Sequence, residues 1–184
     1  MPRGDKSSSA AKPHIVAGMP MYNEEETIGS VVTRALRYVD EVICIDDGSS
    51  DASARIAEAC GATVIRHRVN RGYGGALKTL FLRASQLDAD ALVLLDSDGQ
   101  HETADIPKLL KPILDGEADF AIGSRFVDGG GGTDMPAYRR LGIKVITAAS
   151  NLSSDLGIKD TQSGFRAFSR TALERLRFDS EGME

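Results

Sequence analysis

The sequence is poor in cysteine and has no long apolar run. Of its 184 residues only two are cysteines, Cys44 in an apolar run and Cys60 at the end of a helical pattern. This spacing fits neither a disulfide framework nor a metal site, so we expect free thiols in a reducing compartment. No apolar stretch approaches the roughly 20 residues that a membrane-spanning helix needs.

A basic surface and a signal peptide are also missing. The formal net charge is -5 and the basic residues are scattered, which argues against nucleic-acid binding. The first residues are small and polar without an apolar centre, so residues 1–13 are interpreted as a flexible arm. The final RFDSEGME carries no closing helix or strand signal. We expect the domain of residues 14–184 to be incomplete at its C-terminal end.

The pattern of apolar residues predicts one α/β domain. Short β-branched runs alternate with amphipathic helical patterns, which indicates a mostly parallel sheet with helices on both faces. The runs predict strands at residues 14–20, 41–47, 62–67, 91–96 and 119–124. The periodic segments predict helices at residues 28–36, 51–60, 74–87, 105–114 and about 138–156.

Local signals mark several ends of these elements. Asn23, with Glu26 three residues later, forms a capping-box pattern before the first helix. Asp51 is placed to cap the second helix, and Gly61 to end it. The glycine-rich residues 127–136 predict a mobile loop, with a surface linker and a lid over a site equally supported.

Acidic segments follow most of the predicted strands. Ligands of open α/β sheets bind outside the carboxyl ends of the strands. The first, second and fourth strands end in PMYNEEE, DDGSSD and DSDGQH, and the fifth ends in GSRF. This edge of the sheet is therefore the candidate site.

The segment DSDGQH has the pattern of a metal site. In an extended chain, residues two apart project to the same side, so Asp96 and Asp98 converge and Gln100 adds a third oxygen. Oxygen ligands suit Mg²⁺ or Mn²⁺. Asp, Ser and Gly also favour a plain turn, but the position after a buried strand, beside another acidic strand end, favours the metal.

Two further segments indicate a nucleotide rather than a P-loop or a dinucleotide site. Asp46 or Asp47 can accept hydrogen bonds from a base or ribose, and Tyr22 can flank a base. The segment NRGYGGA (70–76) is similar to a phosphate-binding glycine loop. It matches neither the P-loop pattern nor a full G-x-G-x-x-G, which argues against a P-loop kinase or a nicotinamide enzyme.

Six motifs in order carry a resemblance to a known family. PMYNEEETI, DDGSSD, NRGYGGA, DSDGQH, GSRF and DTQSGFRAF, spread over residues 14–184, resemble the family 2 glycosyltransferases of GT-A fold. Within that family the sequence is most similar to the dolichol- or polyprenol-phosphate mannose or glucose synthases.

The resemblance implies a role for particular residues. It implies a Mg²⁺ or Mn²⁺ ion bound by Asp96, Asp98 and Gln100. The implied nucleotide-binding residues are Pro20, Tyr22, Glu24, Asp46, Asp47, Arg71 and Asp96. The implied acceptor-phosphate residues are Arg125, Arg139, Arg140, Ser163 and Arg166, and the implied catalytic residues are Asp98, Arg125 and Asp160. His67 and His101 are given no role, because a lone histidine is more often structural.

The resemblance also implies a reaction. It is the inverting, metal-dependent transfer of a hexose from a GDP-mannose or UDP-glucose type of donor to a polyprenyl or dolichyl phosphate. The expected place is the cytoplasmic face of a membrane, with peripheral contact. A divalent ion stabilises the leaving diphosphate as a Lewis acid, and a phosphate acceptor, already an anion, needs positioning arginines more than a strong base.

Two alternatives stay open. One is a family 2 transferase with a sugar hydroxyl as acceptor, for which Asp160 is the only late acid that can serve as a base. The other is a non-catalytic domain that binds a nucleotide sugar. The base, the sugar and the oligomeric state are not determined by the sequence.

Overall fold

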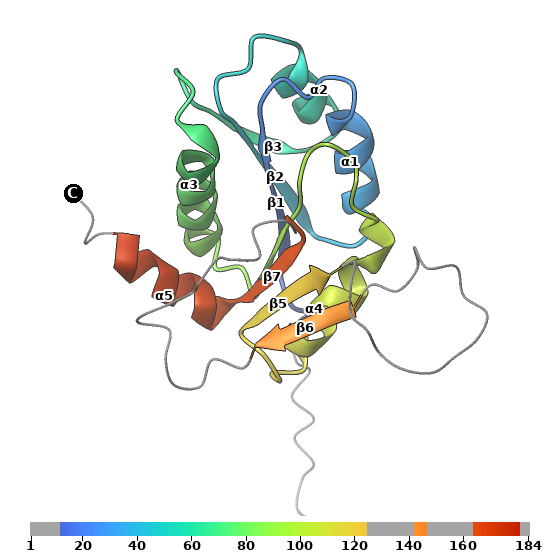
Figure 1. The fold of residues 1–184 in the computed structure, drawn as a ribbon, viewed down its shortest axis with the longest axis vertical. Helices are drawn as coiled ribbons and strands as arrows, with labels where there is room; N and C mark the ends of the chain where they lie inside the picture. The colour runs from blue at the N-terminus through green and yellow to red at the C-terminus, as the bar shows by residue number, and fades with distance from the viewer. Residues whose placement is uncertain (1–11, 125–141, 147–163, 181–184) are drawn as a thin grey trace, which may run out of the picture.

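A seven-stranded sheet forms the centre of the computed structural model, which describes residues 12–124, 142–146 and 164–180 (Figure 1). In spatial order the strands are β3 (Thr63–Arg66), β2 (Glu41–Asp46), β1 (Ile15–Met21), β4 (Ala91–Leu94), β7 (Arg166–Ser169), β5 (Phe120–Ser124) and β6 (Gly142–Ile146). Strands β1 to β4 pair in parallel. β7 is antiparallel to both β4 and β5, so β5 runs with the parallel strands, and β6 runs against it. The predicted α/β class with a mostly parallel sheet is confirmed.

Helices cover both faces of the sheet, as predicted. One face carries α1 (Ile28–Ala35), α2 (Ser53–Ala59) and α4 (Ile106–Leu114), which follows the 3-10 turn η1 (Thr103–Asp105). The other face carries α3 (Gly72–Gln86) and α5 (Arg170–Ser180), which lie against each other in Figure 1.

Alternation along the strands divides the core into two layers. Odd-numbered residues of β1 pack toward α1 and α4, whereas Val16 packs toward α3. Gly18 is required at its position because a Cβ atom there would lie 2.4 Å from the Leu80 side chain of α3. The close approach of α3 to β1 therefore depends on a residue without a side chain.

The five predicted strands are observed with ends shifted by at most two residues, but three local predictions are wrong. Residues 142–146 form β6 rather than part of a helix, because this β-branched segment pairs with β5. The terminal segment does carry an element, since α5 extends to Ser180. The remaining residues of the predicted helix at 138–156 lie outside the described part, as do residues 1–11 of the predicted arm and the loop at 127–136.

The capping box at the first helix is the third correction. α1 begins at Ile28 with Thr27 as its N-cap, and Asn23 lies in the left-handed region with φ 56°. The Asn23 side chain instead accepts a hydrogen bond from the Ser50 amide at 2.9 Å. Asp51 lies one residue before the N-cap of α2, yet its Oδ1 accepts from the Ser53 amide, and Gly61 ends that helix with φ +97°.

The strand order reverses at β1. From β1 the chain moves outward to β2 and β3, and then crosses back through α3 to β4 on the other side of β1. The carboxyl ends of β1 and β4 therefore lie next to each other at a topological switch point, the usual ligand position in an open α/β sheet.

Candidate functional site

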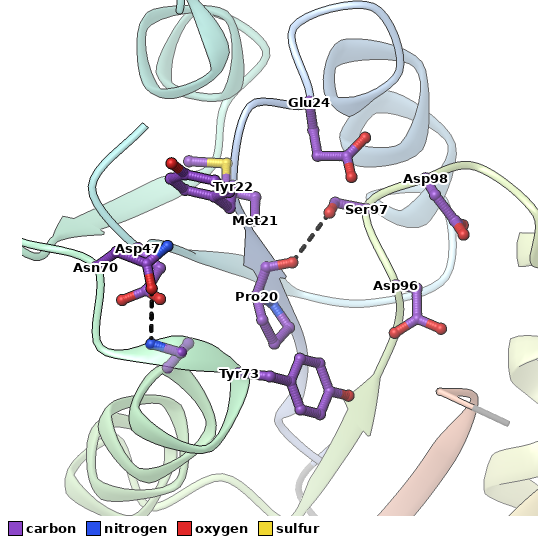
Figure 2. Close-up of a pocket in the computed structure, with 12 residues that line it drawn as sticks. Pro20, Met21, Tyr22, Glu24, Asp47, Asn70, Tyr73, Asp96, Ser97 and Asp98 are labelled. Carbon is purple, nitrogen blue, oxygen red and sulfur yellow. Dashed lines mark hydrogen bonds between the residues drawn. The ribbon is translucent and has the colours of Figure 1, made fainter. Parts of the chain in front are cut away.

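A cavity of about 360 Å³ lies at this switch point. It is formed by the segments after β1, β2 and β4 and by the first turn of α3 (Figure 2). Its lining residues are Pro20, Met21, Tyr22, Glu24, Asp47, Asn70, Gly72, Tyr73, Ala76, Asp96, Ser97 and Asp98. Asp47 and Asn70 lie at one end in Figure 2, Asp96 and Asp98 at the other, and Tyr73 between them.

The segment after β1 is fixed to the segment after β2 by hydrogen bonds in both directions. The Glu24 amide donates to Ser53 Oγ at 2.7 Å, and the Glu25 amide donates to Asp51 Oδ2 at 3.1 Å. In return the Ala52 amide donates to Glu25 Oε2 at 2.8 Å. These hydrogen bonds fix the backbone at the rim of the cavity, where the side chain of Tyr22 is half exposed.

The two acids at the end of β2 have different environments. Asp46 is fully buried, accepts from the Ser49 amide and pairs with Arg66 Nε, both at 2.9 Å. It is not among the residues that line the cavity. Asp47 lines it and is 4% exposed. Of these two acids at the end of β2, the structure brings only Asp47 to the cavity.

Asp47 is held by several donors. His67 Nδ1 lies 2.7 Å from Asp47 Oδ1, and the Arg71 amide donates to the same oxygen at 2.9 Å. Burial by itself raises the pKa of Asp47, but the hydrogen bonds from His67 and from the amides of Arg71 and Gly72 outweigh it and lower the pKa. Asp47 is therefore a preformed hydrogen-bond acceptor. Arg71 contributes this amide, while its side chain is exposed and outside the lining.

The glycine-rich segment forms the first turn of α3 rather than a free loop. Gly72 has φ +77°, which favours glycine, and its amide donates to Asn70 Oδ1 at 2.9 Å (Figure 2). Tyr73 follows and is half exposed at the cavity. Burial and the charge of Asp96 raise the pKa of Tyr73, and Arg166 opposes them. The charge of Arg166, on β7, therefore acts on this part of the cavity.

Asp96 and Asp98 lie on the cavity side of the segment after β4, as their spacing predicts. Ser97 between them also lines the cavity, and its hydroxyl donates to the Pro20 carbonyl at 3.0 Å (Figure 2). Asp98 Oδ1 accepts from the Gln100 amide at 2.9 Å, which tightens the turn. The structure thus has both the turn and two carboxylates that line the cavity.

The Asp96 carboxylate is enclosed by the segment before β7. His101 Nε2 lies 2.9 Å from Asp96 Oδ2, and the His101 ring stacks on Phe165 with centroids 5.5 Å apart. A Cβ atom on Gly164 would lie 1.9 Å from Asp96 Oδ2. The DTQSGFRAF segment therefore contacts the DSDGQH segment directly through Gly164 and Phe165.

The residues present fit a divalent ion that is shared with a substrate. In residues 12–124, 142–146 and 164–180 no group of three or more His, Cys, Asp or Glu side chains could hold a metal ion. Two carboxylates on one turn supply hard oxygen ligands, which suits a Mg²⁺ or Mn²⁺ ion that takes its other ligands from water and substrate phosphates.

Several predicted site residues cannot be placed. Outside the described ranges lie the catalytic and acceptor candidates Arg125, Arg139, Arg140, Asp160 and Ser163. The sequence interpretation in turn missed six lining residues, namely Met21, Asn70, Gly72, Tyr73, Ala76 and Ser97. Asn70 and Tyr73 lie in the glycine-rich segment. The position of this segment just before a predicted helix is the sequence signal that could have identified them as lining residues.

The helices of the described part include none that is long and apolar enough to cross a membrane. Both cysteines found there are free, with Cys44 buried, and burial together with the charge of Asp46 raises the pKa of the Cys44 thiol to about 12.

The fold and the acidic cavity define the class of protein. A mostly parallel sheet with carboxylates at the switch point is the arrangement of the GT-A glycosyltransferases, and the structure matches solved members of that class. Glucosyl-3-phosphoglycerate synthase from Mycobacterium tuberculosis in complex with Mn²⁺ and UDP-glucose matches with a TM-score of 0.58 and 30% identity. The match covers 88% of this chain and 57% of that one.

Sequence comparison gives the family. Residues 17–177 match the model of glycosyl transferase family 2, and the chain belongs to that family. It is 32% identical to the UDP-N-acetylglucosamine–dolichyl-phosphate N-acetylglucosaminyltransferase of Methanococcus voltae, over 86% of this chain and 70% of that protein. It is 33% identical to the dolichol-phosphate mannosyltransferase of Pyrococcus furiosus, over 90% of this chain and 49% of that protein. The predicted resemblance is confirmed.

Proposed function

We propose that the protein transfers a hexose from a nucleoside-diphosphate sugar to a polyprenyl or dolichyl phosphate, with inversion and with Mg²⁺ or Mn²⁺. The observation that carries the proposal is the cavity at the switch point, with a hydrogen-bond acceptor at one end and two carboxylates at the other. A nucleoside diphosphate has the matching order of groups, a base that donates hydrogen bonds and a diphosphate that binds a metal ion.

Each end of the cavity then has a substrate group. Asp47 accepts hydrogen bonds from the base or ribose, and Tyr22 on the rim flanks the base. Pro20 and Glu24 complete the nucleotide end. This assignment leaves Asp46 as a structural residue, because it is fully buried, bonded to the Ser49 amide and Arg66, and outside the cavity lining.

Asp96 and Asp98, with Gln100 beside them, would hold the ion against the donor diphosphate. The ion would supply Lewis-acid stabilisation of charge on the leaving group. Asp98 is exposed and Asp96 is partly exposed, so both can reach a ligand in the cavity. The chain's own contribution is to fix the two carboxylates in place before the donor binds.

The acceptor side of the site is assigned to arginine residues. Arg166 acts electrostatically on the Tyr73 part of the cavity, consistent with a site for an anionic acceptor. Arg125, Arg139, Arg140 and Ser163 are proposed to join it, and Asp160 to serve the chemical step. A polyprenyl phosphate acceptor would place residues 14–184 at the cytoplasmic face of a membrane, in peripheral contact with it.

The acceptor proposal is supported by the relatives named for transfer to dolichyl phosphate. The solved relative named for 3-phosphoglycerate provides the competing acceptor class. Transfer assays with polyprenyl phosphate and with phosphoglyceric acid as parallel acceptors distinguish the two. Product on the lipid phosphate alone supports the proposal, and product on phosphoglyceric acid alone overturns it.

The donor site is tested by calorimetric titration of GDP and UDP, each with and without Mn²⁺, on wild type and on Asp98→Ala. We expect one nucleotide to bind tightly only with Mn²⁺, and Asp98→Ala to lose that dependence. Binding that is indifferent to both the ion and Asp98 would remove the basis of the proposal.

A further inference from the structure

His67 is a buried histidine that has no part in the function described so far. It directly follows β3, and its amide continues the sheet by donating to the Asp46 carbonyl at 2.8 Å. Its side chain is buried, and each of its ring nitrogens has a hydrogen-bond partner. The ring therefore has a single well-defined position between β2 and α3.

One ring nitrogen is bound to the carboxylate at the nucleotide end of the cavity. His67 Nδ1 lies 2.7 Å from Asp47 Oδ1. An ionised carboxylate only accepts hydrogen bonds, so Nδ1 carries hydrogen and donates it. The Arg71 amide donates to the same oxygen. The orientation of the Asp47 carboxylate is therefore fixed through its Oδ1 atom.

The other ring nitrogen is bound to α3. His67 Nε2 lies 2.8 Å from Thr79 Oγ1, and Thr79 is itself bonded to the Gly75 carbonyl at 3.1 Å. Gly75 belongs to the first turn of α3, which also carries Tyr73 at the cavity. A continuous chain of hydrogen bonds thus joins Asp47, His67, Thr79 and the helix that borders the site.

We propose that His67 is a positioning residue for nucleotide binding. It fixes the Asp47 carboxylate relative to α3 so that this carboxylate can accept a hydrogen bond from the nucleotide. The proposal rests on the proposed function, because it takes Asp47 as a nucleotide contact. Such a residue touches no substrate and acts only through Asp47. Its loss weakens nucleotide binding without removing the chemical groups that carry out transfer.

Two substitutions at His67 separate its two hydrogen bonds. The amide nitrogen of Asn is close to the place of Nδ1, and that of Gln is close to the place of Nε2. His67→Asn therefore keeps a donor for Asp47 and loses Thr79, whereas His67→Gln keeps the reach to Thr79 and loses Asp47. The two variants differ by one methylene, and both side chains are uncharged.

The measurement is the Kd of UDP and of GDP by calorimetry with Mn²⁺, together with the melting temperature of each variant. We expect His67→Gln to raise the Kd of the preferred nucleotide by roughly tenfold or more, the scale of one hydrogen bond to a charged group. His67→Asn is expected to stay within about threefold of wild type. In steady-state assays the KM for the donor should rise in His67→Gln while kcat is kept, as for a loss of uniform binding.

A double-mutant cycle tests the path through Asp47. In an Asp47→Ala background, His67→Gln should cause little further loss, because the carboxylate that it positions is absent. If a His67 variant fails to fold, Thr79→Val and Thr79→Ser carry the same test at the far end of the chain. Val removes the hydroxyl and should weaken nucleotide binding by a few-fold, and Ser keeps it and should not.

The outcomes separate the two proposals. Wild type that binds neither UDP nor GDP would overturn the proposed function. Wild type that binds, with His67→Asn and His67→Gln equal in Kd, would overturn the role of His67 alone. A loss of affinity that only follows the melting temperature would also overturn it, since a purely structural histidine behaves in that way.

Discussion

Two pairs of aspartates lie at the carboxyl ends of β2 and β4, the strands on either side of β1. The pairs differ in solvent exposure and in hydrogen bonding. Asp46 ends β2 and Asp47 follows it, and both are nearly inaccessible to solvent and are held by main-chain and side-chain donors. Asp96 and Asp98, after β4, are accessible from the cavity. Each of these two accepts one hydrogen bond at 2.9 Å, Asp96 from His101 and Asp98 from the Gln100 amide.

The spacing within each pair explains the difference. Consecutive residues of an extended chain point to opposite sides, so at the end of β2 one acid enters the core and one faces the cavity. Residues two apart point to the same side, so after β4 both carboxylates reach the cavity, while the hydroxyl of Ser97 between them donates to the Pro20 carbonyl. In the consecutive pair, Asp46 is structural. In the pair that Ser97 separates, both acids are candidate metal ligands.

The largest expected effect is at the exposed pair. Asp98→Asn keeps the size of the side chain and removes the charge that a divalent ion needs. We expect the rate of transfer at saturating donor to fall by roughly 10²–10³-fold, the scale of several kcal/mol of electrostatic stabilisation. The melting temperature should not change by more than about 2 °C, because Asp98 is exposed.

Asp115 offers a control for that substitution. It is an exposed acid at the end of α4, far along the chain from the cavity. Asp115→Asn should leave the transfer rate unchanged. Equal activity in Asp98→Asn and Asp115→Asn would show that the acids after β4 form only a turn.

The next effect concerns the contact between Asp96 and Gly164. A methyl group at Gly164 would overlap the Asp96 carboxylate, so Gly164→Ala must displace that side chain. We expect the affinity for Mn²⁺ in the presence of nucleotide to fall about tenfold or more, measured by electron paramagnetic resonance. Gly74→Ala is the matched control, since nothing lies within 4 Å of the added atom. If both variants bind Mn²⁺ equally, Asp96 is not a ligand in this geometry.

The buried acid should respond in stability rather than in metal binding. Asp46→Ala leaves the Ser49 amide and Arg66 without their partner. We expect the free energy of unfolding to fall by about 2 kcal/mol, measured by urea denaturation. The folded fraction should keep the Mn²⁺ dependence of nucleotide binding. A loss of that dependence at unchanged stability would make Asp46 part of the ligand site.

Much of this comparison could be predicted from sequence, because local patterns determine it. The alternation of apolar runs and helical patterns predicted the α/β sheet, and the two-residue spacing predicted that Asp96 and Asp98 lie on the same side of the chain, where both line the cavity. The sequence could not separate Asp46 from Asp47. Which of two consecutive residues faces a ligand depends on which face of the sheet α3 covers, and that is a tertiary property.

The wrong predictions have a similar cause. Residues 142–146 have a pattern that suits a helix or a strand, and pairing with β5 decides for the strand. Asn23 has the spacing of a capping box, but the segment after β2 supplies better partners through Ser49 and Ser50. In both places long-range hydrogen bonds override a local signal.

The smallest expected effect concerns how the free energy of unfolding depends on pH. The pKa of Asp47 is lowered in the fold, so its contribution to stability is present above its ordinary value of about 3.9 and is lost as the pH falls below that value toward the folded pKa. Asp47→Asn removes this titration. We therefore expect the variant to show a shallower fall in the free energy of unfolding below about pH 4 than wild type.

In both wild type and Asp47→Asn, Asp40 still makes the free energy of unfolding depend on pH, because the hydrogen bond from Lys12 lowers the pKa of Asp40 as well. The informative quantity is the difference between the two pH profiles, followed by urea denaturation from pH 6 to pH 3. Parallel profiles would mean that His67 and the Arg71 amide do not stabilise the ionised Asp47 carboxylate. The buried pair would then lack the preformed acceptor that distinguishes Asp47 from the exposed acids after β4.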